Sequence, residues 1–332
     1  MKLPITLDSS RNKIAAVGSA LVDLCLLEDD DFLAQTGARK GGMTLVDNQF
    51  IQQVLQKSKR QPVIVPGGSA CNTILGAGKL GAQSRFIGKR GNDELGKLFE
   101  DGLRNHNVEP VLMQSQTPTG HVLSVITPDA QRSMFSYLGA AAETTPEEIT
   151  ADLFADCAIV HLEGYLLFNE KLMMAALEAA KTAGAYISLD LASFTVVESA
   201  HQLLEKITEK YVDILIANED EARAFTGHSD EEKALQSLSK KSPIAVLKVG
   251  KRGSHIASNG ETFTIKAMGN GTAIDTTGAG DLWAAGFLFG LLKGFPLKKC
   301  GDLGSACGYE VCQVIGASIP ESGYERIRSL FL

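Results

Sequence analysis

The chain lacks the features that mark membrane-spanning and nucleic-acid-binding proteins. No long basic run occurs among its 32 lysines and arginines, and 39 acidic residues give a net charge of −7. This balance leaves no electrostatic footprint for a polyanion, so we expect no nucleic acid partner. The longest apolar run, Leu282–Leu292, is too short to cross a bilayer, so we expect no membrane partner either.

Patterned cysteines and a secretory leader are also missing. The six cysteines form no C-x-x-C pair and show no metal-ligand spacing with the six histidines. Reduced, buried thiols are therefore the expected state. Residues 1–13 contain no apolar core of the kind that a signal peptide needs, so we expect a cytoplasmic protein.

The composition allows an ordinary globular core, because 44% of the 332 residues are hydrophobic and 21% are charged. From Pro146 onward, short apolar segments alternate with helical patterns, which predicts parallel β-α-β units. The expected strands are 158–162, 185–190, 214–217 and 244–249. The expected helices are 170–184, 199–210, 219–226, 278–293, 298–314 and 321–330. The predicted fold is α/β, a doubly wound and mostly parallel sheet flanked by helices.

The first half of the chain predicts a small β-rich piece. Residues 13–27 are rich in Val, Ala and Leu, and predict a buried strand followed by a second extended segment. Residues 119–142 alternate β-branched and aromatic side chains around a turn at Pro128, which predicts a hairpin. We expect a single domain over residues 1–332, with lid segments at about 19–50 and 112–142 inserted in it.

Two glycine patterns look like familiar phosphate motifs. Residues 76–81 match the G-x-G-x-x-G of NAD dehydrogenases, but they lie inside a helical stretch that begins near Ser69, so close helix packing is the preferred interpretation. Residues 91–98 resemble a P-loop, but Leu98 stands where the motif needs Ser or Thr for Mg²⁺. No strand is expected closely before that segment, so we reject both motifs.

The strongest functional signal is the segment Asp275–Asp281, which runs into a helical pattern. Gly278, Ala279 and Gly280 are small, so their backbone amides and the helix dipole offer an anion hole. Such a site stabilises the charge on a phosphoryl group in transfer. Asp281 is the candidate base, with a simple N-cap as the alternative. The helix N-terminus favours its ionised form, which predicts a weak base.

Two further segments are weaker signals. In residues 66–72, paired glycines join a strand to a helix, and Asn72 can bond a hydroxyl; an ordinary turn is the alternative. Asn218 and Glu221 follow the strand 214–217, at the end where open parallel sheets bind ligands. They can hold Mg²⁺-bound water and phosphate oxygens, although a solvated acidic helix start is the alternative.

Together these segments resemble the ribokinase/PfkB carbohydrate-kinase family. Residues 67–72 through 88–93 are similar to its N-terminal signature, and Asp275–Asp281 is similar to its C-terminal signature. Asn218-x-x-Glu221 is similar to its N-x-x-E motif, and the order and spacing agree over nearly the whole chain. The resemblance implies a ribokinase-like kinase that uses ATP and Mg²⁺ on a small-molecule hydroxyl, as a monomer or a homodimer.

The resemblance also implies roles for single residues. Asp281 is the base, and Gly278, Ala279 and Gly280 form the anion hole. The implied acceptor-binding residues are Asp23, Gly42, Gly67, Gly68, Asn72 and Glu163. The implied nucleotide-binding residues are Asn218, Glu221, Lys248, Gly250 and Gly253, although Lys248 stands where many members have Thr. Asp275 and Thr277 match a loop that holds a monovalent cation, usually K⁺, in many members.

The acceptor is less narrowly defined. Ribokinases carry Asn at the position of Leu21, whereas adenosine kinases resemble this sequence there. Phe135 and Tyr137 would suit a flat base, so we expect an adenosine-like nucleoside. The same aromatics would also suit lid packing, and a sugar kinase of the ribokinase or fructokinase type is the alternative. A sugar phosphate would need a cationic site, for which the candidates are Arg39, Lys40, Lys89, Arg90 and Arg132. A non-catalytic nucleoside- or sugar-binding regulator is the rival from another class.

Overall fold

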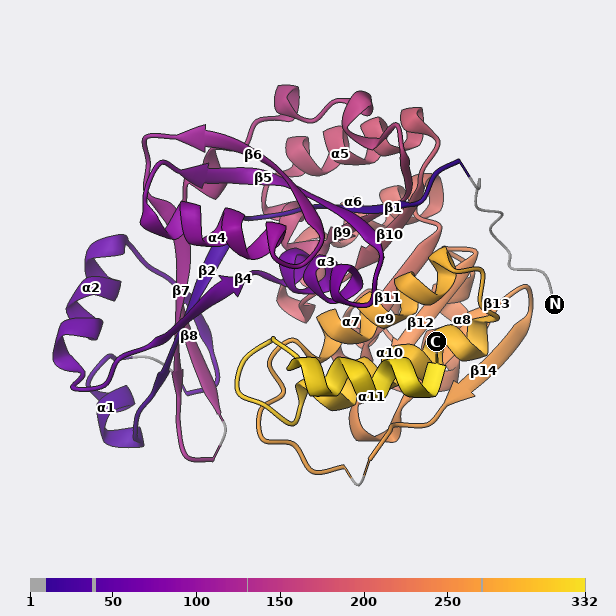
Figure 1. The fold of residues 1–332 in the computed structure, drawn as a ribbon. Helices are drawn as coiled ribbons and strands as arrows, with labels where there is room; N and C mark the ends of the chain where they lie inside the picture. Colours follow the sequence, from indigo (N-terminus) through magenta and orange to yellow (C-terminus); the bar gives the residue numbers. More distant parts are fainter. Residues whose placement is uncertain (1–9, 38–39, 130, 270, 332) are drawn as a thin grey trace.

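The structure is a computed structural model that describes residues 10–37, 40–129, 131–269 and 271–331. A sheet of nine strands carries helices on both faces, and a second sheet of five strands lies beside it (Figure 1). In spatial order the large sheet contains β14 (Glu261–Ile265), β13 (Ser254–Ser258), β12 (Ile244–Lys248), β11 (Ile214–Asn218), β10 (Tyr186–Asp190), β9 (Cys157–Glu163), β1 (Lys13–Val17), β5 (Gln83–Gly91) and β6 (Val108–Ser115).

The large sheet confirms the predicted doubly wound α/β fold. Strands β12, β11, β10, β9, β1, β5 and β6 pair in parallel, and only the β13–β14 hairpin at one edge is antiparallel. The four strands expected after Pro146 lie within two residues of their predicted bounds. The strands β5, β6, β13 and β14 were not predicted.

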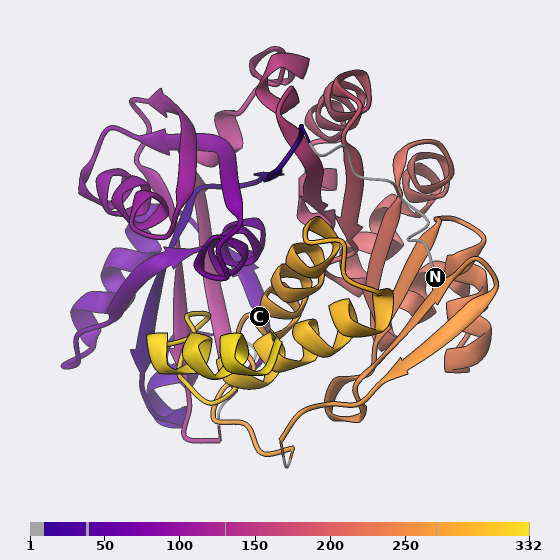
Figure 2. The same ribbon diagram turned by 45° about the vertical axis from the view of Figure 1, so that its right-hand side comes forward.

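Helices cover both faces of this sheet (Figure 2). Successive strand residues point to opposite faces, so a strand covered on both sides is apolar throughout. In β1, Ile14 and Ala16 join one core cluster, while Ala15 and Val17 join the other. The first cluster includes α3 (Ser69–Lys79), α4 (Glu94–Arg104), α9 (Ala279–Leu292), α10 (Leu297–Val311) and α11 (Glu321–Phe331). The second includes α5 (Glu170–Ala183), α6 (Phe194–Tyr211), α7 (Glu219–Thr226) and α8 (Glu231–Ser239).

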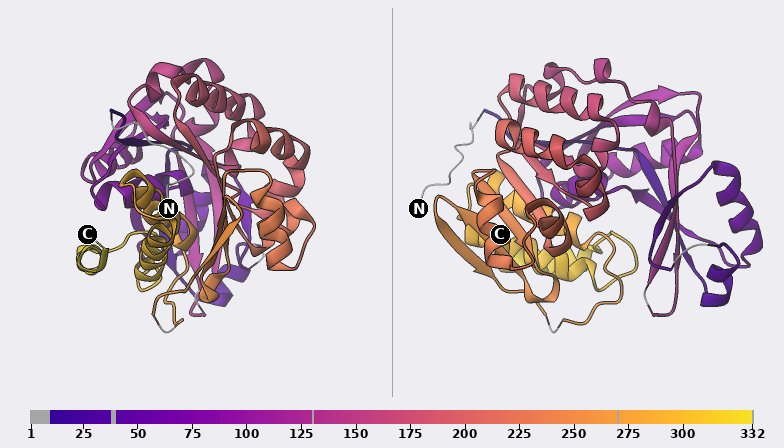
Figure 3. Two further views of the ribbon diagram at one scale, coloured as in Figure 1. Left: turned by 90° about the vertical axis from the view of Figure 1, so that its right-hand side faces the viewer. Right: turned by 180° about the vertical axis from the view of Figure 1, so that it is seen from behind.

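The smaller sheet is the predicted lid, and it stands beside the large sheet when the molecule is seen from behind (Figure 3). Its order is β3 (Met43–Leu45), β8 (Arg132–Gly139), β7 (Thr119–Ile126), β2 (Leu21–Leu27) and β4 (Val63–Gly67). The predicted hairpin is confirmed, because β7 and β8 pair antiparallel. The helices α1 (Asp30–Ala34) and α2 (Asn48–Lys57) belong to the same part of the chain.

The lid differs from the expected segments at two points. Strand β4 lies outside them but pairs with β2, whereas residues 112–115 lie in β6 of the large sheet. Local patterns show that a strand exists, but the choice of its partner depends on distant residues. The helix expected from Ser199 begins at Phe194, with Ala200 in a non-helical conformation. No helix in the described residues is long and apolar enough to span a membrane.

Short 3-10 helices join these elements around the lid and the sheet edge. They are η1 (Ala140–Glu143), η2 (Pro146–Glu148), η3 (Ala151–Phe154), η4 (Gly164–Phe168) and η5 (Gly250–Arg252). The helix η4 follows β9 directly, and η5 follows β12. Both therefore lie at carboxyl ends of parallel strands, where ligands bind in open α/β sheets.

Candidate active site

A cavity of about 1390 Å³ lies between the lid and the large sheet. The lid contributes residues of β2, β3, β7 and β8 to its wall, and the N-termini of α3 and α9 complete it. The carboxyl ends of four parallel strands line it with charged or polar side chains, namely Glu163, Asp190, Asn218 and Lys248. This is the strand end at which the sequence places the ligand site.

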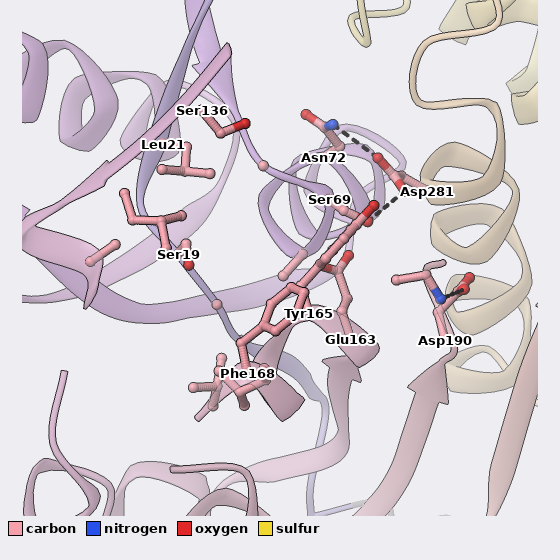
Figure 4. A pocket seen from close by; sticks show the side chains of 18 of the residues that line it. Ser19, Leu21, Ser69, Asn72, Ser136, Glu163, Tyr165, Phe168, Asp190 and Asp281 are labelled. Carbon is pink, nitrogen blue, oxygen red and sulfur yellow. Dashed lines mark hydrogen bonds between the residues drawn. The ribbon is translucent and has the colours of Figure 1, made fainter. Parts of the chain in front are cut away.

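Asp281 lies in the first turn of α9 and is held by two donors from α3 (Figure 4). The Ser69 hydroxyl donates to its Oδ1 at 2.7 Å, and the Asn72 amide donates to its Oδ2 at 2.9 Å. The Thr73 hydroxyl donates to the backbone carbonyl of Asp281 at 3.2 Å. These contacts fix the candidate base in one orientation, and they make Ser69 a site residue that the sequence reasoning did not identify.

Two glycines of α3 allow close packing, Gly76 against α9 and Gly78 against the segment after α4. A Cβ on Gly76 would lie 2.6 Å from Cδ1 of Leu282, and a Cβ on Gly78 would lie 2.2 Å from the carbonyl oxygen of His106. The packing interpretation is therefore confirmed for Gly76 and Gly78, whereas Gly81 lies in the turn after α3 with φ +101°, and a Cβ there would have no close neighbour. For the P-loop pattern, the expectation that no strand closely precedes Gly91 is wrong, because β5 ends there. The rejection of that motif now depends on Leu98 alone.

Burial strengthens the hold of Asp281 on its proton. Its removal from water raises the pKa of the carboxyl group, and the hydrogen bonds from Asn72 and Ser69 oppose this only in part. The prediction of a weak base is therefore wrong in direction. A helix N-terminus is worth about 0.3–1 kcal/mol at exposed positions, and desolvation of a buried carboxylate outweighs it.

The candidate anion hole uses fewer amides than predicted. Gly278 lies in the left-handed region with φ +71°, and the N–H of Ala279 donates to the carbonyl of Thr276 at 3.2 Å. Within the described part of the chain, the amides of Gly278 and Gly280 have no hydrogen-bond acceptor. Two of the three predicted donors are therefore free to bind an anion.

Carboxylates form the acceptor side of the cavity. Asp23 on β2 is 8% exposed, and burial raises its pKa to about 6, with Arg132 opposing the shift. Gly67 makes room for it, because a Cβ there would lie 2.2 Å from Cγ of Asp23. Glu163 is buried, and its Oε1 has no partner among the described residues. Gly68, with φ +88°, also lines the cavity.

Gly42 lies away from this side. Its carbonyl accepts a hydrogen bond from the Met134 N–H at 2.8 Å, and neither Gly42 nor Gly67 lines the cavity. Both glycines therefore have a structural explanation in the lid. Asn72 is also partly committed, because its amide nitrogen already bonds Asp281.

The predicted nucleotide-binding residues Asn218, Glu221 and Lys248 line another part of the cavity, called here the nucleotide side. The Asn218 side chain caps α7 and accepts from the Glu221 N–H at 3.0 Å, while its own amide donates to Glu221 at 2.7 Å. Burial raises the pKa of Glu221 to about 7, with Asp190 adding to the shift and Lys248 opposing it. Gly250 and Gly253 lie in the η5 turn and do not line the cavity.

The predicted cation loop is ordered around Asp275. Its Oδ1 accepts from the Thr277 N–H at 2.9 Å and from the Thr277 hydroxyl at 2.7 Å, and its Oδ2 accepts from the Gly316 N–H at 2.8 Å. These oxygen atoms are of the type that hard cations prefer. In the described ranges, no three His, Cys, Asp or Glu side chains are grouped to hold a metal ion.

The aromatic prediction is wrong in register. Met134, Ser136 and Leu138 of β8 line the cavity, so the alternate residues face the other side of the lid. Phe135 is 2% exposed and packs on Phe50 at 5.1 Å between ring centroids, and Tyr137 packs on His121 at 5.3 Å.

The aromatic side chains that do line the cavity belong to η4. Tyr165 and Phe168 are 40% and 63% exposed, and their rings stack with centroids 6.5 Å apart at 27° (Figure 4). Their segment has neither helix nor strand periodicity, so no pattern in the sequence pointed to them. Stacking of a planar group is the function that exposed parallel rings in a cavity favour.

The basic residues proposed for a phosphate site are mostly paired elsewhere. Lys40 bonds Asp30 and Asp129, Lys89 bonds Glu148, and Arg90 bonds Glu100. Arg132 differs, because it lines the cavity and makes no ion pair within the described residues. Arg39 lies outside the described residues.

Asp190 is another cavity residue that the sequence reasoning missed. Asp190 is the last residue of β10, just as Asn218 is the last residue of β11, and both line the cavity. The strand-end rule that selected Asn218 would have selected Asp190 as well.

The buried carboxylates of Asp23, Glu163 and Glu221 line the cavity together with the N-terminus of α9, which is suited to bind phosphate. Asp281, the candidate base, lies in the first turn of that helix. This arrangement on a doubly wound sheet defines an α/β kinase that acts on small molecules.

Comparison with known proteins identifies the family. Residues 12–322 match the family model for pfkB family carbohydrate kinases, and the chain belongs to this family. The protein is therefore an ATP-dependent carbohydrate or nucleoside kinase. The fold matches adenosine kinase from Sinorhizobium meliloti with a TM-score of 0.89 and 30% identity, over 96% of this chain and 99% of that chain.

Two further relatives show how broad the acceptor range is. A probable sugar kinase from Rhizobium etli has a TM-score of 0.89 and 30% identity, over 97% of this chain and 99% of that chain. A 5-dehydro-2-deoxygluconokinase from Geobacillus thermodenitrificans is 27% identical over 72% of this chain and 76% of the relative. Family membership therefore leaves the acceptor of this protein unresolved.

Proposed function

We propose that this protein transfers the γ-phosphoryl group of ATP to a hydroxyl of an adenosine-like nucleoside. The stacked pair Tyr165–Phe168 is the observation that carries this proposal, because it offers a flat apolar surface in the same cavity as Asp281. A free sugar has no planar group to use such a surface. The apolar Leu21, which also lines the cavity, agrees with a base in this region.

In this proposal the ribose lies between the lid and the base. Asp23 and the unpartnered Oε1 of Glu163 accept hydrogen bonds from its hydroxyls, which removes the cost of leaving buried acceptors unsatisfied. Asn72 and Ser69 orient Asp281, which takes the proton of the reacting hydroxyl. The freed amides of Gly278 and Gly280 face the phosphoryl group.

The proposed site also includes Mg²⁺ and K⁺, each held by few protein side chains. Bound Mg²⁺ neutralises charge on the phosphate oxygens, and Asn218 and Glu221 are placed to hold its water ligands. A K⁺ ion beside Asp275 and Thr277 would hold the segment that leads into α9.

The test is kcat/KM for adenosine, inosine, ribose, fructose and fructose phosphates under one condition. Phe168→Ala should lower kcat/KM for nucleosides by roughly three- to tenfold and leave free sugars unchanged, because one stacking contact is worth about 0.5–1.5 kcal/mol. Phe194→Ala is the control, since Phe194 is 46% exposed and lies outside the cavity. A free sugar or sugar phosphate preferred about tenfold over every nucleoside would contradict the nucleoside proposal and leave the kinase standing.

One observation favours a second acceptor class, a sugar that carries an anionic group. Of the basic residues predicted for a phosphate site, Arg132 is the one among the described residues that lines the cavity. Its positive charge lowers the pKa of Asp23. Arg132→Met should therefore lower kcat/KM for an anionic sugar by more than tenfold but change that for adenosine much less. Adding 5-dehydro-2-deoxygluconate to the panel, which already contains fructose phosphates, separates the two acceptor classes.

A further inference from the structure

A buried ion pair lies at the nucleotide side of the cavity. The Lys248 ammonium is 2.6 Å from Oδ2 of Asp190, and the two side chains are 14% and 9% exposed. The two residues end β12 and β10, so the pair reaches across the end of β11, where Asn218 lies. Burying two charges is costly unless their geometry is good, so the position of this pair invites an explanation other than stability.

Asp190 is held independently of its partner. Its Oδ1 accepts from the Ala192 N–H at 3.1 Å, in a turn where Ala192 has φ +63°. One oxygen is therefore bound by backbone and the other by the ammonium. An Asp190 fixed in this way is suited to hold Lys248 in place.

Lys248 points toward the start of α9. A Cβ on Gly280 would lie 3.0 Å from Nζ of Lys248, so the ammonium is next to the Gly280 backbone. The free amide of Gly280 and the positive end of the helix dipole lie in the same place. The ammonium and the helix N-terminus both attract an anion, so a phosphoryl group bound here in the proposed reaction would be stabilised by both of them.

The charge of Lys248 is stable in this environment. Burial alone would lower its pKa, but Asp190, Glu221 and Asp281 together raise it above the ordinary lysine value. The side chain therefore acts as a fixed positive charge and takes no part in proton transfer.

We propose that Lys248 is a catalytic residue that binds the phosphoryl group during its transfer, and that Asp190 is a positioning residue that holds the Lys248 ammonium beside Gly280. The inference rests on the proposed ATP-dependent transfer but not on the identity of the acceptor. In the step, the acceptor oxygen bonds to the γ-phosphorus as the bond to the β,γ-bridging oxygen breaks. The hydroxyl proton goes to Asp281, and ADP leaves with the bonding electron pair.

The test compares two variants with the wild-type protein, Lys248→Met and the neutral double variant Asp190→Asn/Lys248→Met. Lys248→Met leaves Asp190 buried without its partner, so the melting temperature should fall. Turnover should fall roughly 10²–10³-fold, as when a donor to developing charge is removed. ADP lacks the γ-phosphoryl group, so its dissociation constant should change less than about threefold.

The double variant separates catalysis from structure. Two neutral side chains no longer leave a buried charge unpaired, so its melting temperature should recover toward the wild-type value while its turnover stays as low as that of Lys248→Met. Asp190→Asn alone keeps the ammonium but loosens it, and should lower kcat about tenfold with little change in KM for ATP. Lys240→Met, at an exposed lysine after α8, is the control for loss of one positive charge.

Two outcomes would overturn the inference. Turnover of the double variant within about threefold of wild type would show that the pair only stabilises the fold. A loss of ADP affinity as large as the loss of kcat would show that Lys248 binds the nucleotide in the ground state. Turnover is measured with the best acceptor of the wild-type protein. If that acceptor is not a nucleoside, the ratios of variant to wild-type turnover still test the role of Lys248.

Discussion

At the scale of single residues, the cavity gathers carboxylates that are largely cut off from water. Burial raises the pKa of Asp23, Glu163, Glu221 and Asp281. Neighbouring carboxylates add to these shifts, Asp281 at Asp23 and Glu163, and Asp190 at Glu163, Glu221 and Asp281. Burying such a set without ligands costs free energy, but hydroxyl groups that donate hydrogen bonds to the carboxylates, together with bound Mg²⁺, would offset this cost. The charge state of these groups should therefore control both activity and stability.

The first prediction concerns the base. Asp281→Asn keeps the shape and removes the proton acceptor, so turnover should fall by roughly 10²–10⁴ while the affinities for ATP and acceptor change much less. The measurement is single-turnover kinetics together with equilibrium binding. A variant that keeps more than about a tenth of wild-type turnover, with chemistry rate-limiting, would contradict the assignment. Asp302→Asn on α10, outside the cavity, is the control.

The second prediction concerns the pH dependence of kcat. Because burial raises the pKa of Asp281, its ionised form is lost as the pH falls through a value above the ordinary aspartate pKa of 3.8. The acid limb of the kcat profile should therefore lie at a higher pH than an exposed aspartate would give. Ser69→Ala removes a hydrogen bond that lowers this pKa, so it should move the limb further up. An unchanged or lowered limb in this variant would contradict the model of charge control.

The third prediction concerns stability and Asp23. Its pKa of about 6 in the folded state exceeds the unfolded value of 3.8, so its contribution favours folding below pH 3.8 and is lost as the pH rises through 6. The charged form then costs roughly 3 kcal/mol at pH 8. Asp23→Asn should raise the free energy of unfolding at pH 8, and this gain should fall to roughly half at pH 5. Asp101→Asn, exposed on α4, should show no such gain, and an equal gain at both pH values for Asp23→Asn would refute the argument.

At the scale of elements, the contact between α3 and α9 positions the base. The donors Ser69 and Asn72 come from α3 and the carboxylate from α9, so a small shift between the helices would separate them. Gly76 lies at the point of closest approach, next to Leu282 and Ala285. The packing of two helices, rather than any single hydrogen bond, therefore sets the geometry of Asp281.

The fourth prediction tests this contact. Gly76→Ala should destabilise the protein by about 1–3 kcal/mol, because the new methyl group meets Leu282 and Ala285 at less than 3.0 Å. It should also lower kcat, since the helices must move apart. Gly308→Ala on α10 is the matched control, because its nearest contact would be an ordinary 3.4 Å. Full activity and stability in Gly76→Ala would show that the helices can adjust without moving the base.

The fifth prediction concerns the loop that leads into α9. Asp275 binds Thr277 and the backbone of Gly316, and a K⁺ ion there would fix the loop further. We expect higher activity in K⁺ than in a bulky organic cation at equal ionic strength, with Mg²⁺ also required. Asp275→Asn should reduce this preference. Identical rates of the wild-type protein in both salts would count against the cation site.

At the scale of the whole molecule, the lid is joined to the rest by one continuous core. Val22, Leu24 and Leu123 of the lid belong to the same buried cluster as residues of α3 and α9. The cavity lies between the two sheets, so ligands contact both of them at once. The lid and the large sheet should therefore behave as one cooperative unit, and a ligand that binds the native state should stabilise both together.

Local patterns in the sequence were enough to predict many of the elements and several of the chemical groups of this protein. Periodicity and strand-end positions are local properties, so they predicted the parallel β-α-β units, the β7–β8 hairpin and the placement of Asp281 in the first turn of α9. The glycine-rich start of that helix was readable for the same reason. Family resemblance supplied the roles of Asp23 and Glu163, which no local pattern shows.

Tertiary structure decided what depends on distant neighbours. The lid recruited β4, and the register of β8 turned Phe135 away from the cavity, because both depend on which strand lies alongside. Burial by surrounding elements raised the pKa of Asp281 against the direction that its helix position alone predicts. The pair of Asp190 and Lys248 joins residues 58 positions apart in the chain, so only the folded sheet could bring their charges together.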